Sequence, residues 1–127
     1  MKEPGNSELI ATPLANCWLD GDVLCVKNIN CDRTLDNVEL HYKILRSALG
    51  QKAHPWLKEF PTCPTFDKRA RLLAAANLPF HCQALAVVVP AEAVNSMNAS
   101  FKEVKQAGVP VKVFANEKDA RNWLEHL

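Results

Sequence analysis

One uninterrupted apolar run constrains the fold of this chain more than any other feature. The segment Gln83-Ala-Leu-Ala-Val-Val-Val89 carries apolar side chains at consecutive positions and is followed directly by Pro90. Such a run is typical of a strand that is covered on both faces or flanked by neighbouring strands. Pro90 suits the first turn of a helix, because a backbone N–H would have no partner there. The run therefore predicts a buried strand that leads directly into a helix.

Strand-like and helical segments alternate on both sides of this strand, which is typical of an α/β protein with parallel pairing in its later part. The turn Asp20-Gly21-Asp22 predicts an opening hairpin, which adds an antiparallel edge. The other predicted elements are a first strand over 15–19, a helix from Thr34 to a stop at Gly50, a strand over 53–60, a helix over 65–76, a helix from Pro90 to Gly108, a strand over 109–114 and a helix after Asn116.

Polar residues at the starts of these segments predict helix N-caps, because a side-chain oxygen there can accept a free backbone N–H. We expect Thr34, Thr65 and Asn116 to be these caps. In the last helix, Trp123 lies about one turn beyond Ala120 and on the same side. We therefore expect the Trp123 indole to be buried in the main core.

Composition restricts the class of protein. The chain has 127 residues, 48% of them hydrophobic, and 15 Lys and Arg against 14 Asp and Glu, a net charge of +1. The length suits one domain, which we place over residues 8–127, after a flexible tail over 1–7. Balanced charge gives no electrostatic reason to expect nucleic acid. Neither a membrane-spanning run nor a signal peptide is expected, so the sequence predicts a cytoplasmic protein.

The cysteines indicate neither a metal site nor a redox motif. They are five in number, with irregular spacing and no C-x-x-C pair, so we expect free thiols, no metal and no cofactor. No phosphate-binding or hydrolase motif accompanies them. An enzyme that uses Cys63 with a distant histidine is the hypothesis that the sequence favours least.

Two segments carry a resemblance to a known family. They are Phe66-Asp-Lys-Arg-Ala-Arg-Leu-Leu-Ala74 in the second predicted helix and the closing unit Val109 to Leu124, with its Val113-Phe114 and Trp123-Leu124 pairs. This ending resembles that of bacterial SpoIIAA-like, STAS-type domains. The resemblance implies a two-layer domain with a mixed four- or five-stranded sheet and about four helices mainly on one face. It also implies a non-enzymatic regulatory or protein-interaction role.

The regulatory chemistry of the family does not follow from the resemblance. In anti-sigma-factor antagonists of this fold, a serine at the start of the second helix is phosphorylated, whereas residues 61–68 here read Pro-Thr-Cys-Pro-Thr-Phe-Asp-Lys. Thr62 or Thr65 could accept a phosphate, but Thr65 is more simply an N-cap. The departure leaves the fold as the shared property.

The most distinctive surface feature is the basic cluster Lys68, Arg69 and Arg71. It predicts either a solvated helix face or a docking patch for an acidic partner, and Arg71 could instead pair with a nearby carboxylate. The partner would be another protein or a second copy of the chain. The alternative is a carrier of a small apolar or lipid-like ligand between sheet and helices, because the domain is also distantly similar to the CRAL-TRIO fold.

Overall fold

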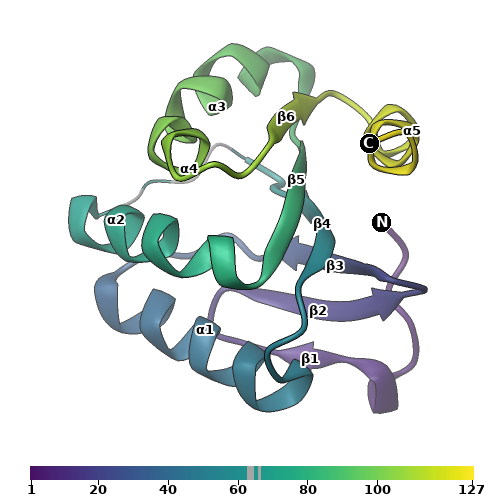
Figure 1. Ribbon diagram of the computed structural model, residues 1–127, viewed down its shortest axis with the longest axis vertical. Coiled ribbons are helices and arrows are strands. Elements are labelled where there is room, and N and C mark those ends of the chain that lie inside the picture. The colour runs from purple at the N-terminus through teal and green to yellow at the C-terminus, as the bar shows by residue number, and fades with distance from the viewer. Residues whose placement is uncertain (63–64, 66) are drawn as a thin grey trace.

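In a computed structural model, which describes residues 1–62, 65 and 67–127, the chain forms a mixed α/β fold around a six-stranded sheet (Figure 1). The strands lie side by side in chain order. Five of them confirm the predicted strands, and the sixth, β1, is an addition to the expected four or five. Two residues are too few to show a period-2 pattern, so the sequence could not indicate this strand. The strands are β1 (Ile10–Ala11), β2 (Ala15–Asp20), β3 (Val23–Asn28), β4 (His54–Glu59), β5 (Cys82–Val88) and β6 (Val111–Phe114).

The sheet combines two kinds of pairing, as the alternation predicted. Strands β1, β2 and β3 pair antiparallel, and β3 through β6 pair parallel. The β2–β3 hairpin turns at Gly21, whose φ of 61° is a conformation that glycine adopts without steric cost. The parallel half places the carboxyl ends of β3, β4, β5 and β6 at one edge of the sheet.

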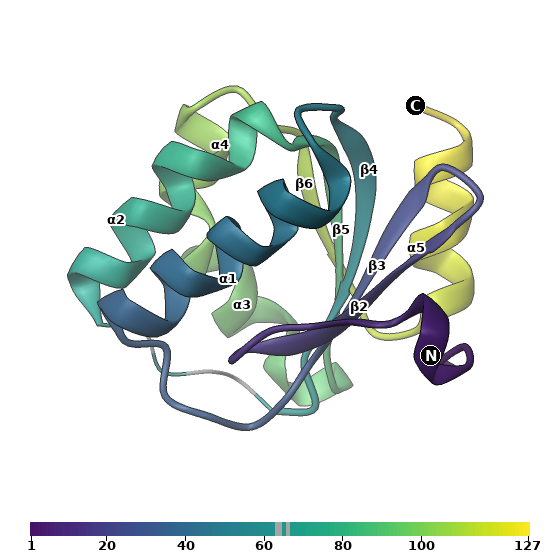
Figure 2. The same ribbon diagram turned by 90° about the horizontal axis from the view of Figure 1, so that it is seen from below.

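The helices lie on both faces of the sheet, but unequally (Figure 2). Four of them cover one face, and α5 lies alone on the other. Short 3-10 turns add η1 (Asn6–Glu8), η2 (Leu78–Phe80) and η3 (Ala91–Ala93). The α-helices are α1 (Leu35–Leu49), α2 (Lys68–Asn77), α3 (Val94–Ser100), α4 (Lys102–Gln106) and α5 (Glu117–Glu125).

Alternate residues of the strands build two separate apolar clusters. Trp56 and Leu85 point to the four-helix face and join the larger cluster, which we call the main core. Their neighbours Leu57 and Ala86 point the other way and meet Ala120 of α5 in a smaller cluster, the second core. This division follows from the period of two in a strand. The predicted burial of the run in β5 on both faces is therefore confirmed.

Trp123 does not lie in the main core, so that expectation is wrong. Its ring is only partly buried, and it packs against Phe114 in the second core, with ring centroids 5.9 Å apart. The short connection between β6 and α5 fixes the helix against the sheet, as expected, but it carries the chain to the opposite face. A spacing argument selects the buried side of a helix but not the face of the sheet that the helix covers.

Two of the three expected caps are confirmed. Thr34 accepts a hydrogen bond from Asn37 N, and Asn116 accepts one from Asp119 N. The expectation for Thr65 is wrong, because Asp67 accepts from Arg69 N and α2 begins at Lys68. An aspartate directly before the first turn serves as well as a threonine and also suits the helix dipole. Phe66, expected in the buried stripe of this helix, lies outside the described residues.

The helix expected from Pro90 to Gly108 is interrupted. It divides into α3 and α4 at Phe101, whose ψ of 18° leaves the α-helical range. Met97, Phe101 and Val104 of its predicted apolar stripe are nevertheless buried in the main core. The break changes the path of the helix while the apolar positions still face the sheet.

The first residues of the chain make several contacts with the sheet and α5. The terminal ammonium lies 3.0 Å from Glu59 Oε2 and 3.5 Å from Glu117 Oε1. Glu3 Oε1 accepts a hydrogen bond from Asn16 Nδ2. The flexibility expected for residues 1–7 stays a prediction.

Candidate functional site

The outer surface of α1 and α2 carries large apolar side chains that the protein leaves in solvent. Leu40 of α1 and Leu72 of α2 are 45% and 47% exposed, and Phe80 of η2 is 73% exposed. Each helix buries another side, with Val38 and Tyr42 of α1 and Ala70 of α2 in the main core. We call the outer surface the helix-pair face and define it by Leu40, Lys43, Arg46, Lys68, Arg69, Leu72 and Phe80.

A shallow hollow runs between the two helices. It has a volume of about 330 Å³, and its lining includes Lys43 and Arg46 of α1 and Leu73 of α2. Arg46 donates from Nη1 to Asn77 Oδ1 at 3.2 Å, which joins the ends of the two helices. The hollow therefore combines an apolar floor with basic and amide groups.

A second hollow continues the helix-pair face past the end of α2. It also has a volume of about 330 Å³ and is lined by Arg46, Gln51, Asn77, Phe80 and His81. The His81 ring stacks on Tyr42, with centroids 6.2 Å apart. Burial, and secondarily the charge of Arg46, lowers the pKa of His81. The imidazole is therefore predominantly neutral at pH 7 and offers a hydrogen-bonding group beside the exposed Phe80 ring.

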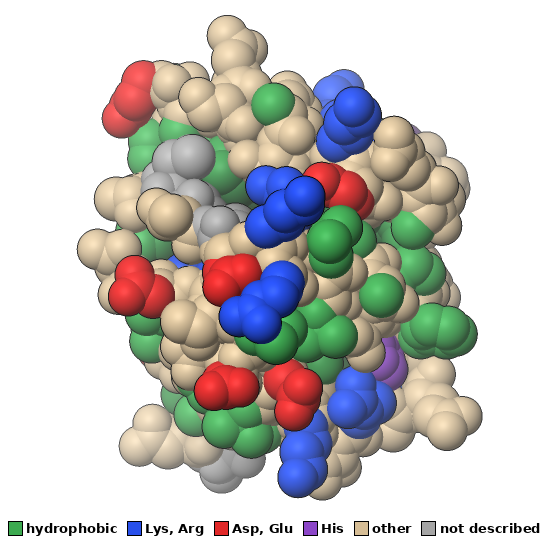
Figure 3. All heavy atoms as spheres, turned by 90° about the vertical axis from the view of Figure 1, so that its left-hand side faces the viewer, with side chains coloured by type: hydrophobic (Ala, Val, Ile, Leu, Met, Phe, Trp, Pro, Cys, Tyr) green, Lys and Arg blue, Asp and Glu red, His purple; other side chains and the backbone are tan. Residues whose placement is uncertain are grey.

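The helix-pair face is mixed in polarity. Figure 3 shows the side of the molecule formed by α1 and α2, where apolar side chains lie among basic and acidic ones. Lys68 and Arg69 are exposed at the start of α2, and Arg69 Nε lies 3.8 Å from Asp67 Oδ1. Such exposed pairs hold their partners weakly, so these cations remain accessible.

Arg71 lies apart from the other two basic residues of the predicted patch. Its Nε lies 3.2 Å from Glu103 Oε1 of α4, so the side chain joins α2 to its neighbour. The structure thus brings Lys68 and Arg69 to the helix-pair face and turns Arg71 toward α4. Thr62 and Thr65 are both exposed, and their phosphorylation stays a prediction.

Sequence reasoning missed the apolar members of this face, although a signal existed for two of them. Leu72 is out of step with the stripe that includes Ala70 and Leu73, and Leu40 is out of step with Val38 and Tyr42. A leucine between the buried positions of an amphipathic helix points outward. Phe80 lies in a 3-10 turn with no period to read.

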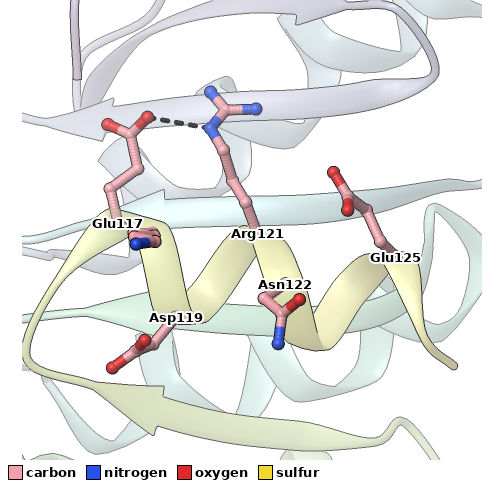
Figure 4. Close-up of a pocket in the computed structure, with 6 residues that line it drawn as sticks. Glu117, Asp119, Arg121, Asn122 and Glu125 are labelled. Carbon is pink, nitrogen blue, oxygen red and sulfur yellow. Dashed lines mark hydrogen bonds and ion pairs between the residues drawn. The ribbon is translucent and has the colours of Figure 1, made fainter.

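The opposite side of the molecule carries a larger but more open hollow along α5 (Figure 4). It has a volume of about 750 Å³ and is lined by α5 alone. Arg121, at the centre of this hollow, is already paired with carboxylates. Its Nε donates to Glu117 Oε2 at 2.8 Å, and its Nη1 lies 3.1 Å from Asp20 Oδ2. The hydrogen bond from Arg121 lowers the pKa of Glu117. These pairs fasten α5 to the hairpin and leave the helix-pair face as the stronger candidate.

The thiols show no sign of activation. Burial raises the pKa of Cys17 and of Cys82 to about 12, and it also raises that of Cys25. A thiolate is the reactive form, so these buried thiols are inert near pH 7. Cys63, the suggested nucleophile, lies outside the described residues. Within the described part of the chain, no group of three or more metal-ligating side chains is placed to hold an ion.

Comparison with known proteins identifies the family. Residues 17–127 match the family described as "Domain of unknown function (DUF7793)". The chain belongs to this family. No curated protein matches this DUF7793 chain. None of the helices formed by the described residues combines the length and apolar character needed to cross a membrane.

A solved structure confirms the expected fold of the DUF7793 domain. It is an uncharacterized protein of the DUF3478 family with a SpoIIAA-like fold, from Shewanella loihica PV-4. The two share 17% sequence identity with a TM-score of 0.62, over 87% of this chain and 91% of that one. At this identity the likeness establishes the fold alone. The SpoIIAA-like resemblance inferred from the chain's ending is confirmed at that level.

Proposed function

We propose that this DUF7793 domain is a non-enzymatic interaction module that binds an acidic protein partner through the helix-pair face. The observation that carries the proposal is the exposure of Leu40, Leu72 and Phe80 on one side of the molecule. Large apolar side chains at an accessible surface are typical anchors of protein–protein interfaces, where they fill pockets of the partner. The expected setting remains the bacterial cytoplasm.

The charges beside these anchors favour an acidic partner. Lys43, Arg46, Lys68 and Arg69 lie beside the apolar side chains, and Asp36, Glu39 and Asp67 offset all but one of these positive charges. Charge complementarity of this kind accelerates encounter and selects among partners more than it adds affinity. Binding should therefore weaken as salt is added.

The carrier alternative has less support from the geometry. Large side chains, among them Trp56, Phe60 and Met97, occupy the region between the sheet and the four helices. The hollows described above lie on the surface instead. Native mass spectrometry of freshly purified protein would show a bound apolar ligand if the carrier hypothesis holds.

Capture of partners from the source cell tests the interaction. We expect wild-type protein to retain a specific acidic protein, identified by mass spectrometry, and we expect Leu72→Glu and Phe80→Glu to lose it. Leu127→Glu is the matched control, because Leu127 is 65% exposed on the far side, beyond α5. Equal retention by all three variants would contradict the proposed face. Retention of the chain itself would identify a homodimer instead.

A further inference from the structure

Three basic side chains gather beneath α1, near the carboxyl ends of β3 and β4: Lys58 of β4, His41 of α1 and Arg33 of the connection before α1. Lys58 of β4 alternates with Leu57, so it points to the same face of the sheet as Trp56 and Phe60. Lys58 Nζ lies 5.3 Å from the centre of the Phe60 ring, and Arg33 Cζ lies 5.2 Å from the same centre. Both cations thus contact one buried aromatic ring.

The third basic group, His41 of α1, has an unsatisfied nitrogen. Its side chain is almost fully buried, at 1% exposure, and Nδ1 lies 2.7 Å from Thr12 Oγ1. That hydroxyl accepts the N–H groups of Leu14 and Ala15 and also lies 3.3 Å from Ala15 O, so its proton goes to the nearer acceptor, His41 Nδ1. The imidazole proton then resides on Nε2, which has no partner among the described residues. A buried donor without an acceptor is costly, which favours a ligand atom at this position.

The electrostatics of the cluster also favour a bound anion. Burial, Lys58 and Arg33 together lower the pKa of His41 to about 3. Burial and the charge of Arg33 lower the pKa of Lys58 to about 8. No carboxylate of a described residue lies within ion-pair distance of Lys58 Nζ. A partly buried ammonium with no carboxylate beside it costs free energy in the folded protein, and an anion bound there would offset that cost.

We propose that Lys58 Nζ and the Nε2–H of His41 bind a small oxyanion, and that Arg33 adds to the positive potential there. Ligands of open α/β sheets bind outside the carboxyl ends of the parallel strands, which is where Lys58 and Phe60 lie. Lys58 is only partly buried, so an anion can approach its ammonium from solvent. The chemistry required is that of a phosphate or carboxylate group. This site is separate from the helix-pair face and does not depend on the proposed docking function.

Titration with inorganic phosphate, followed by amide NMR at constant ionic strength, tests the proposal. We expect saturable shifts of the His41, Lys58 and Phe60 amides, and a rise in the pKa of Lys58 as phosphate binds. Lys58→Met should weaken binding at least about tenfold, as the loss of a charge-assisted hydrogen bond implies. Acetate in place of phosphate distinguishes a carboxylate site from a phosphate site.

Two further variants keep the test decisive. Lys118→Met removes an exposed cation of α5 and should leave the affinity unchanged. His41→Gln should weaken binding independently of Lys58, even if Lys58→Met alters the fold. The proposal is overturned if the shifts grow linearly with both anions, or if they persist unchanged in Lys58→Met and His41→Gln.

Discussion

The two faces of the sheet are built in different ways. The face under α1 to α4 buries a continuous apolar core that includes Trp56, Leu85 and Met97, and it also encloses basic groups. The other face is covered by α5, which contributes Ala120 as a fully buried residue and Trp123 only in part. Hydrophobic burial therefore stabilises the first face, whereas α5 combines a thin apolar contact with charged ones.

Charged contacts help to hold α5 against the sheet, because its apolar contact is small. Arg121 joins the helix to β2 through Asp20 and approaches Cys25 Sγ of β3 at 3.7 Å. Each exposed pair contributes little on its own, typically less than about 1 kcal/mol. Together they orient a helix whose apolar stripe is narrow. We therefore expect substitutions on the four-helix face to be much more damaging than those on the α5 face.

The largest expected effect is that of Trp56→Ala in the main core. Trp56 is 1% exposed, donates from Nε1 to His81 O at 2.9 Å and stacks on Tyr42. Truncation should leave a large cavity and remove one of the two hydrogen bonds that His81 O accepts, and it should lower the free energy of unfolding by about 3–5 kcal/mol. Equilibrium denaturation measures this loss. A decrease below about 1 kcal/mol would contradict the assignment of this face as the main source of stability.

The next largest effect is a pH dependence of stability that arises from His41 on the four-helix face. The pKa of its imidazole is about 3 in the folded protein and near 6.5 in an unfolded chain. Between these values the unfolded state binds more protons, so stability should fall as the pH drops below about 6.5, by about 3 kcal/mol at pH 4. His41→Gln should remove most of this dependence in denaturant unfolding measured from pH 7 to pH 4.

His126→Gln is the matched control for that pH profile. His126 is exposed at the end of α5, so its removal should leave the profile unchanged. If both variants show the wild-type slope, the acid sensitivity does not arise from the buried imidazole.

A smaller effect is expected for Trp123→Ala on the α5 face. The ring is only partly buried and contacts Phe114, so truncation removes part of a contact rather than a filled core position. We expect a loss of about 1–2 kcal/mol and a protein that remains folded. Circular dichroism and denaturant melts beside those of Trp56→Ala test the comparison directly. If Trp123→Ala is unfolded, the α5 face contributes as much to stability as the four-helix face, and the comparison is wrong.

The sequence revealed the elements more readily than their assembly. The apolar run in β5 and the caps at Thr34 and Asn116 depend on neighbouring residues, and all three are confirmed. The face chosen by α5 depends on how a short connection leaves β6, and no residue pattern encodes that direction. The basic cluster was missed because Arg33, His41 and Lys58 come together only when β4, α1 and the connection before α1 pack against one another.

The smallest effect concerns Arg71, where sequence reasoning foresaw a pairing with a carboxylate. Its side chain is 38% exposed and that of Glu103 is 28% exposed, so solvent weakens the ion pair between α2 and α4. Arg71→Ala should therefore cost about 0.5–1 kcal/mol, less than a buried pair would. The double variant Arg71→Ala with Glu103→Ala separates the pair from the packing of the arginine stem. If the two single losses simply add, the stem stabilises the helices and the charge does not. A coupling that disappears in high salt would instead assign the effect to the ion pair, even on the face where apolar burial dominates.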